Sequence, residues 1–127
     1  MFKDTAAFSS FSVNDIAAAK KFYGETLGMD VVENGGMLEV TIAGAGKVLI
    51  YPKPNHVPAT FTILNFPVAA VERTVDELTR RGVRFEHYGG DLQTDAKGIH
   101  RDEGRGPSAI AWFTDPAGNI LSVLEPT

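Results

Sequence analysis

The residues best able to do chemistry in this sequence are three histidines, His56, His87 and His100, and the acidic side chains of the glycine-rich stretch 89–107. Imidazole and carboxylate groups bind divalent metals and serve as general acids and bases. No two of the histidines have the i, i+4 spacing that places two ligands on one helical face, and the carboxylates lack the spacing of a calcium loop. The chain has no cysteine, which excludes thiolate sites. The spacing of these groups alone does not predict a metal site.

Composition limits the classes of function. A length of 127 residues with 43% hydrophobic content predicts one globular domain. The formal net charge of −4 gives no basic surface for nucleic acid, so no nucleic-acid partner is expected. The N-terminus lacks the apolar segment of a signal peptide, and no apolar run approaches the roughly 20 residues of a membrane span. We therefore expect a cytoplasmic protein without a membrane partner.

An internal repeat organises the chain. The segment FSVNDIAAAKKFYGETLGMDV (11–31) aligns with FPVAAVERTVDELTRRGVRF (66–85). Each copy predicts a strand followed by a helix with one apolar face, near 15–27 and 70–81, and each helix is followed by a glycine able to adopt a left-handed conformation, Gly28 or Gly82. Asp15 is the predicted N-cap of the first helix.

Three strand-like runs follow each predicted helix, at 29–33, 37–43 and 47–51 in the first copy and at 83–88, 108–114 and 119–125 in the second. The prolines of 52–58 predict a linker between the copies. The second copy also holds a long glycine-rich connection, 89–107. A loop of this length favours a lid, a binding loop or a dimer contact.

Three motifs give the chain a family resemblance: F-x-V-x-D at 11–15, FYGETLGM at 22–29 and FTDPAGNILSVLE at 113–125. With these motifs on a duplicated βαβββ unit, the sequence resembles the vicinal oxygen chelate superfamily, which includes glyoxalase I, type I extradiol dioxygenases, and fosfomycin- and bleomycin-resistance proteins. The resemblance implies an α+β fold in which two tandem βαβββ modules form an eight-stranded cup-shaped sheet with the helices outside. It also implies a single domain over 1–127, with modules at roughly 1–56 and 57–127, and a homodimer.

Metal-dependent members of this superfamily hold an ion with His and Glu side chains at four strand positions. The resemblance implies that these four positions are occupied in this sequence by Phe8, Ile63, Ser122, and either Leu49 or Tyr51. None of these is a histidine or a carboxylate, and an apolar side chain offers a divalent cation no lone pair. We therefore expect no metal and no other cofactor.

Strand alternation predicts which residues face a ligand in the cup. If Phe8 and Ile63 lie on the concave face, a period of two places further small polar and apolar side chains there. The predicted ligand-binding residues are Phe8, Ser10, Leu49, Tyr51, Ile63, Asn65, Trp112 and Ser122. The alternative is that Phe8, Ile63 and Leu49 fill a closed core, and Trp112 is either a stacking wall or ordinary packing. His87 is expected on a short strand, as a half-buried sheet histidine.

Three functions remain open from the sequence. The first is a metal-independent protein of the glyoxalase/bleomycin-resistance type that binds a small organic ligand, aromatic or cationic. The second is a superfamily enzyme, of lyase or isomerase type, that uses side-chain acids and bases, with His87, Tyr51 and His100 as the candidate catalytic residues. The third is a protein whose main role is association. No spacing in the chain resembles a nucleophile elbow or a catalytic triad, so whether the protein is an enzyme stays open.

Overall fold

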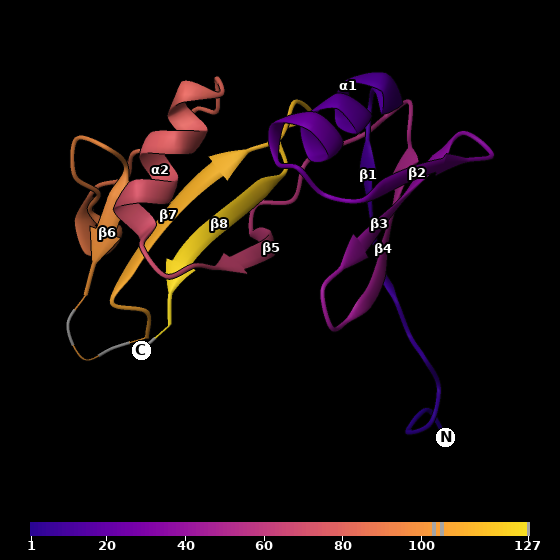
Figure 1. Cartoon of the computed structure of the whole chain (residues 1–127), viewed down its shortest axis with the longest axis horizontal. Helices are drawn as coiled ribbons and strands as arrows, with labels where there is room; N and C mark the ends of the chain where they lie inside the picture. Colours follow the sequence, from indigo (N-terminus) through magenta and orange to yellow (C-terminus); the bar gives the residue numbers. More distant parts are fainter. Residues whose placement is uncertain (103, 105, 127) are drawn as a thin grey trace. The chain divides into compact units, whose positions relative to one another are not determined.

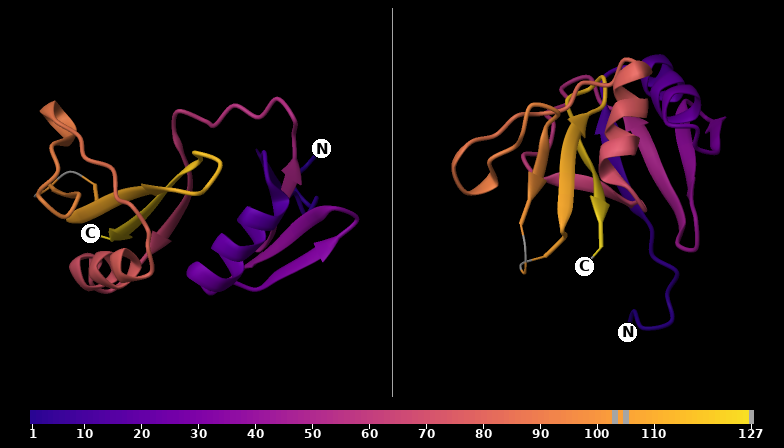
Figure 2. Two further views of the ribbon diagram at one scale, coloured as in Figure 1. Left: turned by 90° about the horizontal axis from the view of Figure 1, so that it is seen from above. Right: turned by 60° about the vertical axis from the view of Figure 1, so that its left-hand side comes forward.

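The computed structural model describes residues 1–102, 104 and 106–126. The chain forms two compact units, Met1–Val57 (unit 1) and Pro58–Thr127 (unit 2), shown in Figures 1 and 2. The fold of each unit is described separately. The single continuous domain and the eight-stranded cup concern the placement of one unit against the other, and they stay predictions.

Unit 1 is a four-stranded sheet with a helix on one face. Its elements are β1 (Ser9–Val13), α1 (Ile16–Lys21), the π-helical turn η1 (Phe22–Thr26), β2 (Val31–Asn34), β3 (Met37–Ile42) and β4 (Gly46–Pro52). The strand order is β1-β4-β3-β2. β1 runs parallel to β4, because the helix makes the crossover, while β4, β3 and β2 are joined as antiparallel hairpins.

Unit 2 repeats this plan. Its elements are β5 (Thr62–Pro67), α2 (Val71–Arg80), the short 3-10 helix η2 (Gly90–Leu92), β6 (Ile99–Arg101), β7 (Ala109–Thr114) and β8 (Ile120–Glu125). The order β5-β8-β7-β6 matches that of unit 1, and β5 is parallel to β8. The predicted α+β class and the βαβββ repeat are therefore confirmed.

The helix of unit 2, α2, lies against one face of its sheet, as Figure 2 shows. The buried apolar residues of each unit form a core between the helix and this face. In β7 the buried residues Ala109, Ala111 and Phe113 alternate with half-exposed ones, so the two faces of the strand differ. The apolar stripe of α2, formed by Val71, Val75 and Leu78, is buried. The opposite face of the sheet carries no helix of its own unit, and this leaves it open. "Open face" below means this side of a sheet.

The local signals for the start of the first helix and for the ends of both helices are confirmed. Asp15 accepts a hydrogen bond from the Ala18 amide at 3.1 Å, as an N-cap does. Gly28 and Gly82 adopt φ of 71° and 90°, a conformation that a residue with a Cβ enters at a cost.

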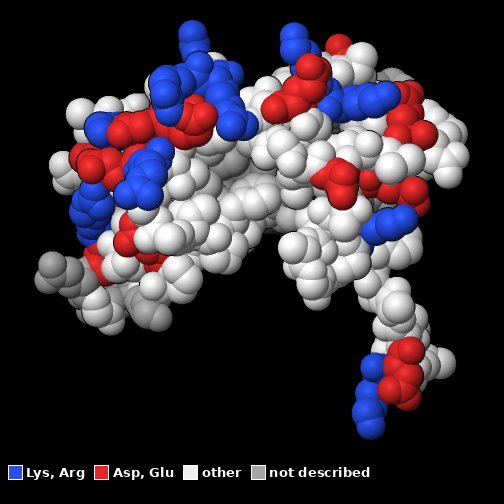
Figure 3. All heavy atoms as spheres, viewed as in Figure 1, with Lys and Arg blue, Asp and Glu red and all other residues white. Residues whose placement is uncertain are grey.

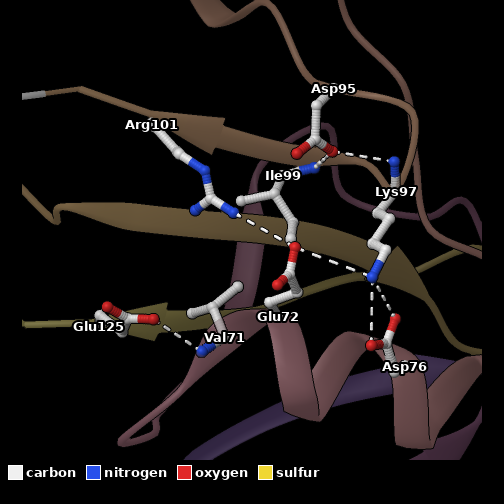
Figure 4. A network of polar contacts seen from close by, with 8 residues as sticks. All are labelled: Val71, Glu72, Asp76, Asp95, Lys97, Ile99, Arg101 and Glu125. Atoms are coloured by element: carbon white, nitrogen blue, oxygen red, sulfur yellow. Dashed lines mark hydrogen bonds and ion pairs between the residues drawn. The ribbon is translucent and has the colours of Figure 1, made fainter.

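The second helix is capped from elsewhere in the sequence. Ala70, at the N-cap position of α2, has no side chain able to accept a hydrogen bond. The carboxylate of Glu125, on β8, accepts instead from the Val71 amide at 2.8 Å (Figure 4). A negative charge at this end also complements the helix dipole. The last strand therefore holds the start of α2.

The D-P-x-G-N motif is a self-contained turn before β8. Oδ1 of Asp115 accepts from the amides of Ala117 and Asn119 at 2.9 and 2.8 Å, and the Asn119 side chain donates to Oδ2 at 3.0 Å. Both polar side chains are buried, and Gly118 supplies the required φ of 86°. The motif thus fixes the hairpin and the register of β8, and its residues have no part in the site described below.

The predicted strand 83–88 is wrong. Only Phe85 pairs with Phe113, and the Glu86 amide donates to the Trp112 carbonyl at 2.8 Å. The chain then leaves the edge of β7 over residues 87–98 and returns to the same edge as β6, inside the stretch predicted to be a loop. At the return, Gly98 has φ of 88° and its backbone lies so close to Phe85 that an added Cβ would clash at 2.9 Å. Residues 87–98 are called the excursion below.

No helix among the described residues is long and apolar enough to cross a membrane.

Candidate functional site

Three of the predicted ligand-binding residues lie in one row on the open face of unit 2. In the strand register Asn65 of β5 is opposite Ser122 of β8, and Ser122 is opposite Trp112 of β7. Residues directly opposite each other in neighbouring strands project from the same face. The structure therefore brings Asn65, Ser122 and Trp112 together, although 57 residues separate the first two in the sequence.

The centre of this row is a partly buried hydrogen bond. The Ser122 hydroxyl donates to Oδ1 of Asn65 at 2.6 Å. Ser122 has 0% of its surface exposed, whereas Asn65 is an exposed residue. No other hydrogen bond of the Asn65 side chain is present among the described residues, so its amide nitrogen is available as a donor of two hydrogens.

Aromatic rings extend the row from Trp112. Tyr88 packs edge-on against Trp112 with ring centroids 5.4 Å apart, and the His100 ring lies 6.4 Å away. Burial, and the negative charge of Glu86 after it, raises the pKa of Tyr88 above its usual value, so the phenol is neutral at physiological pH. This cluster gives the open face of unit 2 a surface suited to stacking against a flat ring.

His100 has a defined protonation pattern. Its Nδ1 lies 2.9 Å from the Gln93 carbonyl oxygen, and a carbonyl only accepts, so Nδ1 carries the hydrogen. In the neutral ring Nε2 is then the acceptor. A hollow of about 370 Å³ adjoins this ring, and its lining includes Gln93, Thr94, His100 and Arg101.

Hydrogen bonds to Asp95 hold the C-terminal end of the excursion, the segment that includes Tyr88. Oδ1 of Asp95 accepts from the amides of Lys97 and Ile99, both at 2.9 Å. Partial burial opposes ionisation of Asp95, but these amides and the charges of Arg101 and Lys97 outweigh it and lower its pKa. The Lys97 ammonium in turn lies 3.0 Å from Asp76 on α2 (Figure 4). The hydrogen bond to Asp76 raises the pKa of Lys97.

Charges of both signs gather over this side of unit 2 in Figure 3. Glu72 and Asp76 of α2 form ion pairs with Lys97 and Arg101 (Figure 4). These pairs are exposed, and exposed ion pairs contribute little stability each. They hold the excursion beside the helix and lie on the side of the sheet opposite the open face. The polar groups near the row on the open face are those of Asn65, Ser122, Tyr88 and His100.

The predicted residues of unit 1 lie on the open face of its own sheet. Ser10 is opposite Leu49, and Ser12 is opposite Tyr51. Phe8, just before β1, is 68% exposed. A hollow of about 280 Å³ is lined by Phe8, Glu39, Lys47, Val48 and Leu49. Within unit 1, then, neither Phe8 nor Leu49 is part of the buried core beneath α1.

Sequence reasoning missed one pair of chemically active groups. The Ser12 hydroxyl lies 2.6 Å from Nδ1 of His56, and the two residues are 44 apart in the chain. A hydroxyl this close to an imidazole nitrogen has the geometry of a nucleophile beside its base. No spacing rule could have found the pair, since it depends on a turn just after β4, in which the His56 amide donates to the Lys53 carbonyl at 3.0 Å.

His87 does not match its prediction. It lies outside any strand and is exposed, so the expected half-buried sheet histidine is wrong. The reason is that the chain leaves the edge of β7 at this residue. His87 lines a hollow of about 450 Å³ between α2 and the excursion, together with Val75, Asp76, Phe85 and Lys97.

The residues at the superfamily's metal positions do not fit a metal. The pair Ser10/Leu49 in unit 1 matches Asn65/Ser122 in unit 2, so Leu49, and not Tyr51, is the counterpart of Ser122. Leu49 and Phe8 have no donor atom, and neither has Ile63, which lies where the β5 register shifts. The Ser122 hydroxyl is engaged with Asn65. No group of three or more His, Asp or Glu side chains suited to a metal is found in the described part of the chain.

A comparison of the sequence with protein families identifies the chain. Residues 6–123 match the model of the Glyoxalase/Bleomycin resistance protein/Dioxygenase superfamily. The chain belongs to this superfamily. No curated protein sequence matches it. The resemblance inferred from the helix end and the final hairpin is therefore confirmed at the level of the superfamily.

Several solved structures have the same fold as this chain. A glyoxalase family protein from Enterococcus faecalis aligns with a TM-score of 0.72 at 21% identity, covering 98% of this chain and 100% of the other. TnmS3, an antibiotic binding protein from Streptomyces sp. CB03234, aligns with a TM-score of 0.71 at 23% identity, covering 100% and 99%. A glyoxalase/bleomycin resistance protein from the same Streptomyces strain gives 0.63 at 25% identity, covering 93% and 97%.

Proposed function

We propose that this superfamily member binds a small organic molecule on the open face of unit 2 without using a metal. The observation that carries the proposal is the row Asn65–Ser122–Trp112, in which a hydrogen-bonded polar pair stands beside an aromatic cluster. Binding sites for small molecules combine apolar and aromatic surface with a few fixed polar groups. This row supplies both within one sheet.

The open face offers apolar area for a ligand to cover. Ile110, Trp112, Ile120 and Leu124 project from β7 and β8 and are only half buried. Covering apolar surface contributes about 25 cal/mol for each Å² removed from water. Apolar contact with these side chains therefore contributes a few kcal/mol, and hydrogen bonds to the polar groups of the row must add to it, because association itself has a cost.

The comparisons support a binding role. TnmS3 is an antibiotic binding protein by its own description, and it shares the fold of this chain. Its identity of 23% supports the fold and leaves the ligand of this protein open. The donor-poor positions Phe8, Leu49, Ile63 and Ser122 support a role that does not require the superfamily's metal.

A ligand screen read by intrinsic fluorescence tests the proposal. The chain has one tryptophan, Trp112, so quenching or a shift of its emission reports on this face alone. Small aromatic and cationic compounds are titrated with EDTA present, and the melting temperature is followed in parallel. Saturable quenching with a matching rise in melting temperature supports the proposal. The absence of both across the screen, with the protein folded, would contradict it.

A second candidate function is favoured by the Ser12–His56 pair. If the protein is an enzyme that works with side-chain groups, this pair in unit 1 is the strongest nucleophile and base arrangement in the described chain, with the two atoms 2.6 Å apart. Tyr51 lies opposite Ser12 on β4. Labelling with a fluorophosphonate, followed by mass spectrometry, tests it. An adduct on Ser12 that disappears in His56→Gln supports an enzyme, and an unlabelled protein contradicts it.

We also propose that the protein forms a homodimer. Strand β2 is an edge of its sheet, and Val32 on it is 59% exposed. An exposed apolar edge strand invites pairing with another chain. Light scattering at tens of micromolar tests this, since an interface of standard size is normally saturated there, and a monomer would contradict it.

A further inference from the structure

We infer that Asn65 binds the ligand by donating its two amide hydrogens. Ser122 does not contact the ligand and is a positioning residue that orients the Asn65 amide. The ligand then carries a hydrogen-bond acceptor, such as a carboxylate or carbonyl, at the edge of a flat ring system. This inference rests on the proposed binding function and specifies the class of ligand.

Burial separates the roles of the two residues. Ser122 is 0% exposed, because Asn65 and Trp112 stand on either side of it in the row, so a ligand on the surface cannot reach its hydroxyl. Asn65 is exposed at the end of the row and offers its amide group to solvent. Of the two residues, Asn65 is therefore the one that can contact a ligand.

The hydrogen bond fixes which way the Asn65 amide faces. Ser122 donates to Oδ1 at 2.6 Å, and this occupies the amide oxygen and turns the nitrogen away. With the amide reversed, Nδ2 would donate to the serine oxygen, and the buried hydroxyl hydrogen would lose the acceptor that it has in this structure. The serine therefore selects the orientation in which Asn65 presents donors, and donors recognise an acceptor.

The row also sets the size of the ligand. Asn65 and Trp112 are two strands apart, and neighbouring strands are about 4.8 Å apart, so the amide and the indole are separated by about 10 Å. A bicyclic ring with an acceptor at the end of its long axis covers this distance when the ring lies against Trp112. 2-Naphthoate is a probe of this shape, and 2-naphthylmethylammonium has the same ring with a donor in place of the acceptor.

The test measures the affinity of both probes by Trp112 fluorescence, with the melting temperature recorded for every variant. The wild-type protein should prefer 2-naphthoate. Asn65→Asp keeps the shape and still accepts from Ser122, but it replaces two donors with a negative oxygen. It should bind 2-naphthoate about tenfold or more weakly and reverse the preference toward 2-naphthylmethylammonium. Asn14→Asp, in the exposed turn between β1 and α1 of unit 1, adds the same charge elsewhere and should change neither affinity.

Ser122 is tested by selectivity. Ser122→Ala frees the amide to turn, so the ratio of the two affinities should fall about fivefold. Ser122→Thr keeps the hydroxyl in a residue that suits a strand and should restore the ratio. A purely structural role would change the melting temperature and leave the ratio as it is in the wild type.

The outcomes are distinguishable. If both probes bind the wild type and Asn65→Asp leaves their ratio unchanged, the role assigned to Asn65 is overturned while binding on this face stands. An unchanged ratio in Ser122→Ala overturns the positioning role. If neither these probes nor any compound in the wider screen binds the folded protein, the proposed function itself fails.

Discussion

The hydroxyl of Ser122 donates a 2.6 Å hydrogen bond to Asn65 across the parallel pair of strands β8 and β5. The resemblance places a metal ligand of the superfamily at position 122, and here the side chain is neutral, buried and already engaged. In this chain the residue at that position, Ser122, therefore orients the side-chain amide of Asn65.

Ser122→Ala should keep the fold and lower the free energy of unfolding by about 1 kcal/mol, the usual net contribution of a neutral hydrogen bond. The loss is small because Asn65 is exposed, so its freed oxygen can bond to water. Urea denaturation measures it. A loss well above 3 kcal/mol would mean that Ser122 supports the core by packing, contrary to this account.

Ser122→Glu should not create a metal site. The other three positions still lack donors, and a carboxylate forced into a fully buried place either takes up a proton or destabilises the fold. Titration with nickel and zinc, followed by elemental analysis after dialysis, is the measurement. A micromolar site in this single variant would show that further ligands already face position 122, and the assignment of Phe8, Leu49 and Ile63 would be wrong.

Much of the fold could be predicted from local signals. Asp15, Gly28 and Gly82 each act within a few residues of their own helix, so the printed sequence is enough to find them. The interrupted edge strand of unit 2 could not be found in this way. Its second piece, β6, has three residues, too few for a periodic pattern, and its return depends on the close packing of Gly98 against Phe85.

The site was predictable in part for the same reason. Strand alternation predicted Asn65 and Ser122 on one face, because alternation is a local rule. For Trp112 the sequence left a stacking wall and ordinary packing both open. The Ser12–His56 contact and the Glu125 cap of α2 join residues 44 and 54 apart, and only the folded chain reveals them. The direction of the Ser122 hydrogen bond likewise depends on which strand lies beside β8.

Glu125→Ala should destabilise unit 2 by about 1 kcal/mol, since it removes the only side-chain acceptor for the Val71 amide in the described structure. Ala70→Ser in the same background places an acceptor at the N-cap itself and should recover part of the loss. Thermal unfolding of the single and double variants checks this. A Glu125→Ala protein as stable as the wild type would show that the cap contributes nothing.

Acid should loosen the excursion through Asp95. Because the pKa of Asp95 is lowered in the folded protein, the stability it contributes is present above the unfolded value of about 3.9 and is lost as the pH falls through the folded pKa. Amide exchange at Lys97 and Ile99, corrected for its intrinsic pH dependence, should therefore lose protection below about pH 4. Asp95→Ala should show the same low protection at neutral pH. Equal protection in that variant would rule out Asp95 as the residue that closes the turn.

The central claim, that unit 2 binds a small acceptor-bearing molecule without a metal, is tested most directly by nuclear magnetic resonance on isotopically labelled protein. The one tryptophan gives a single indole signal, and the side-chain amide of Asn65 can be assigned by its loss in Asn65→Asp. We predict that 2-naphthoate, added with EDTA present, shifts both the Trp112 indole and the Asn65 amide signals along one saturable curve. Signals that stay in place, or that move only after nickel or zinc replaces EDTA, would contradict the claim.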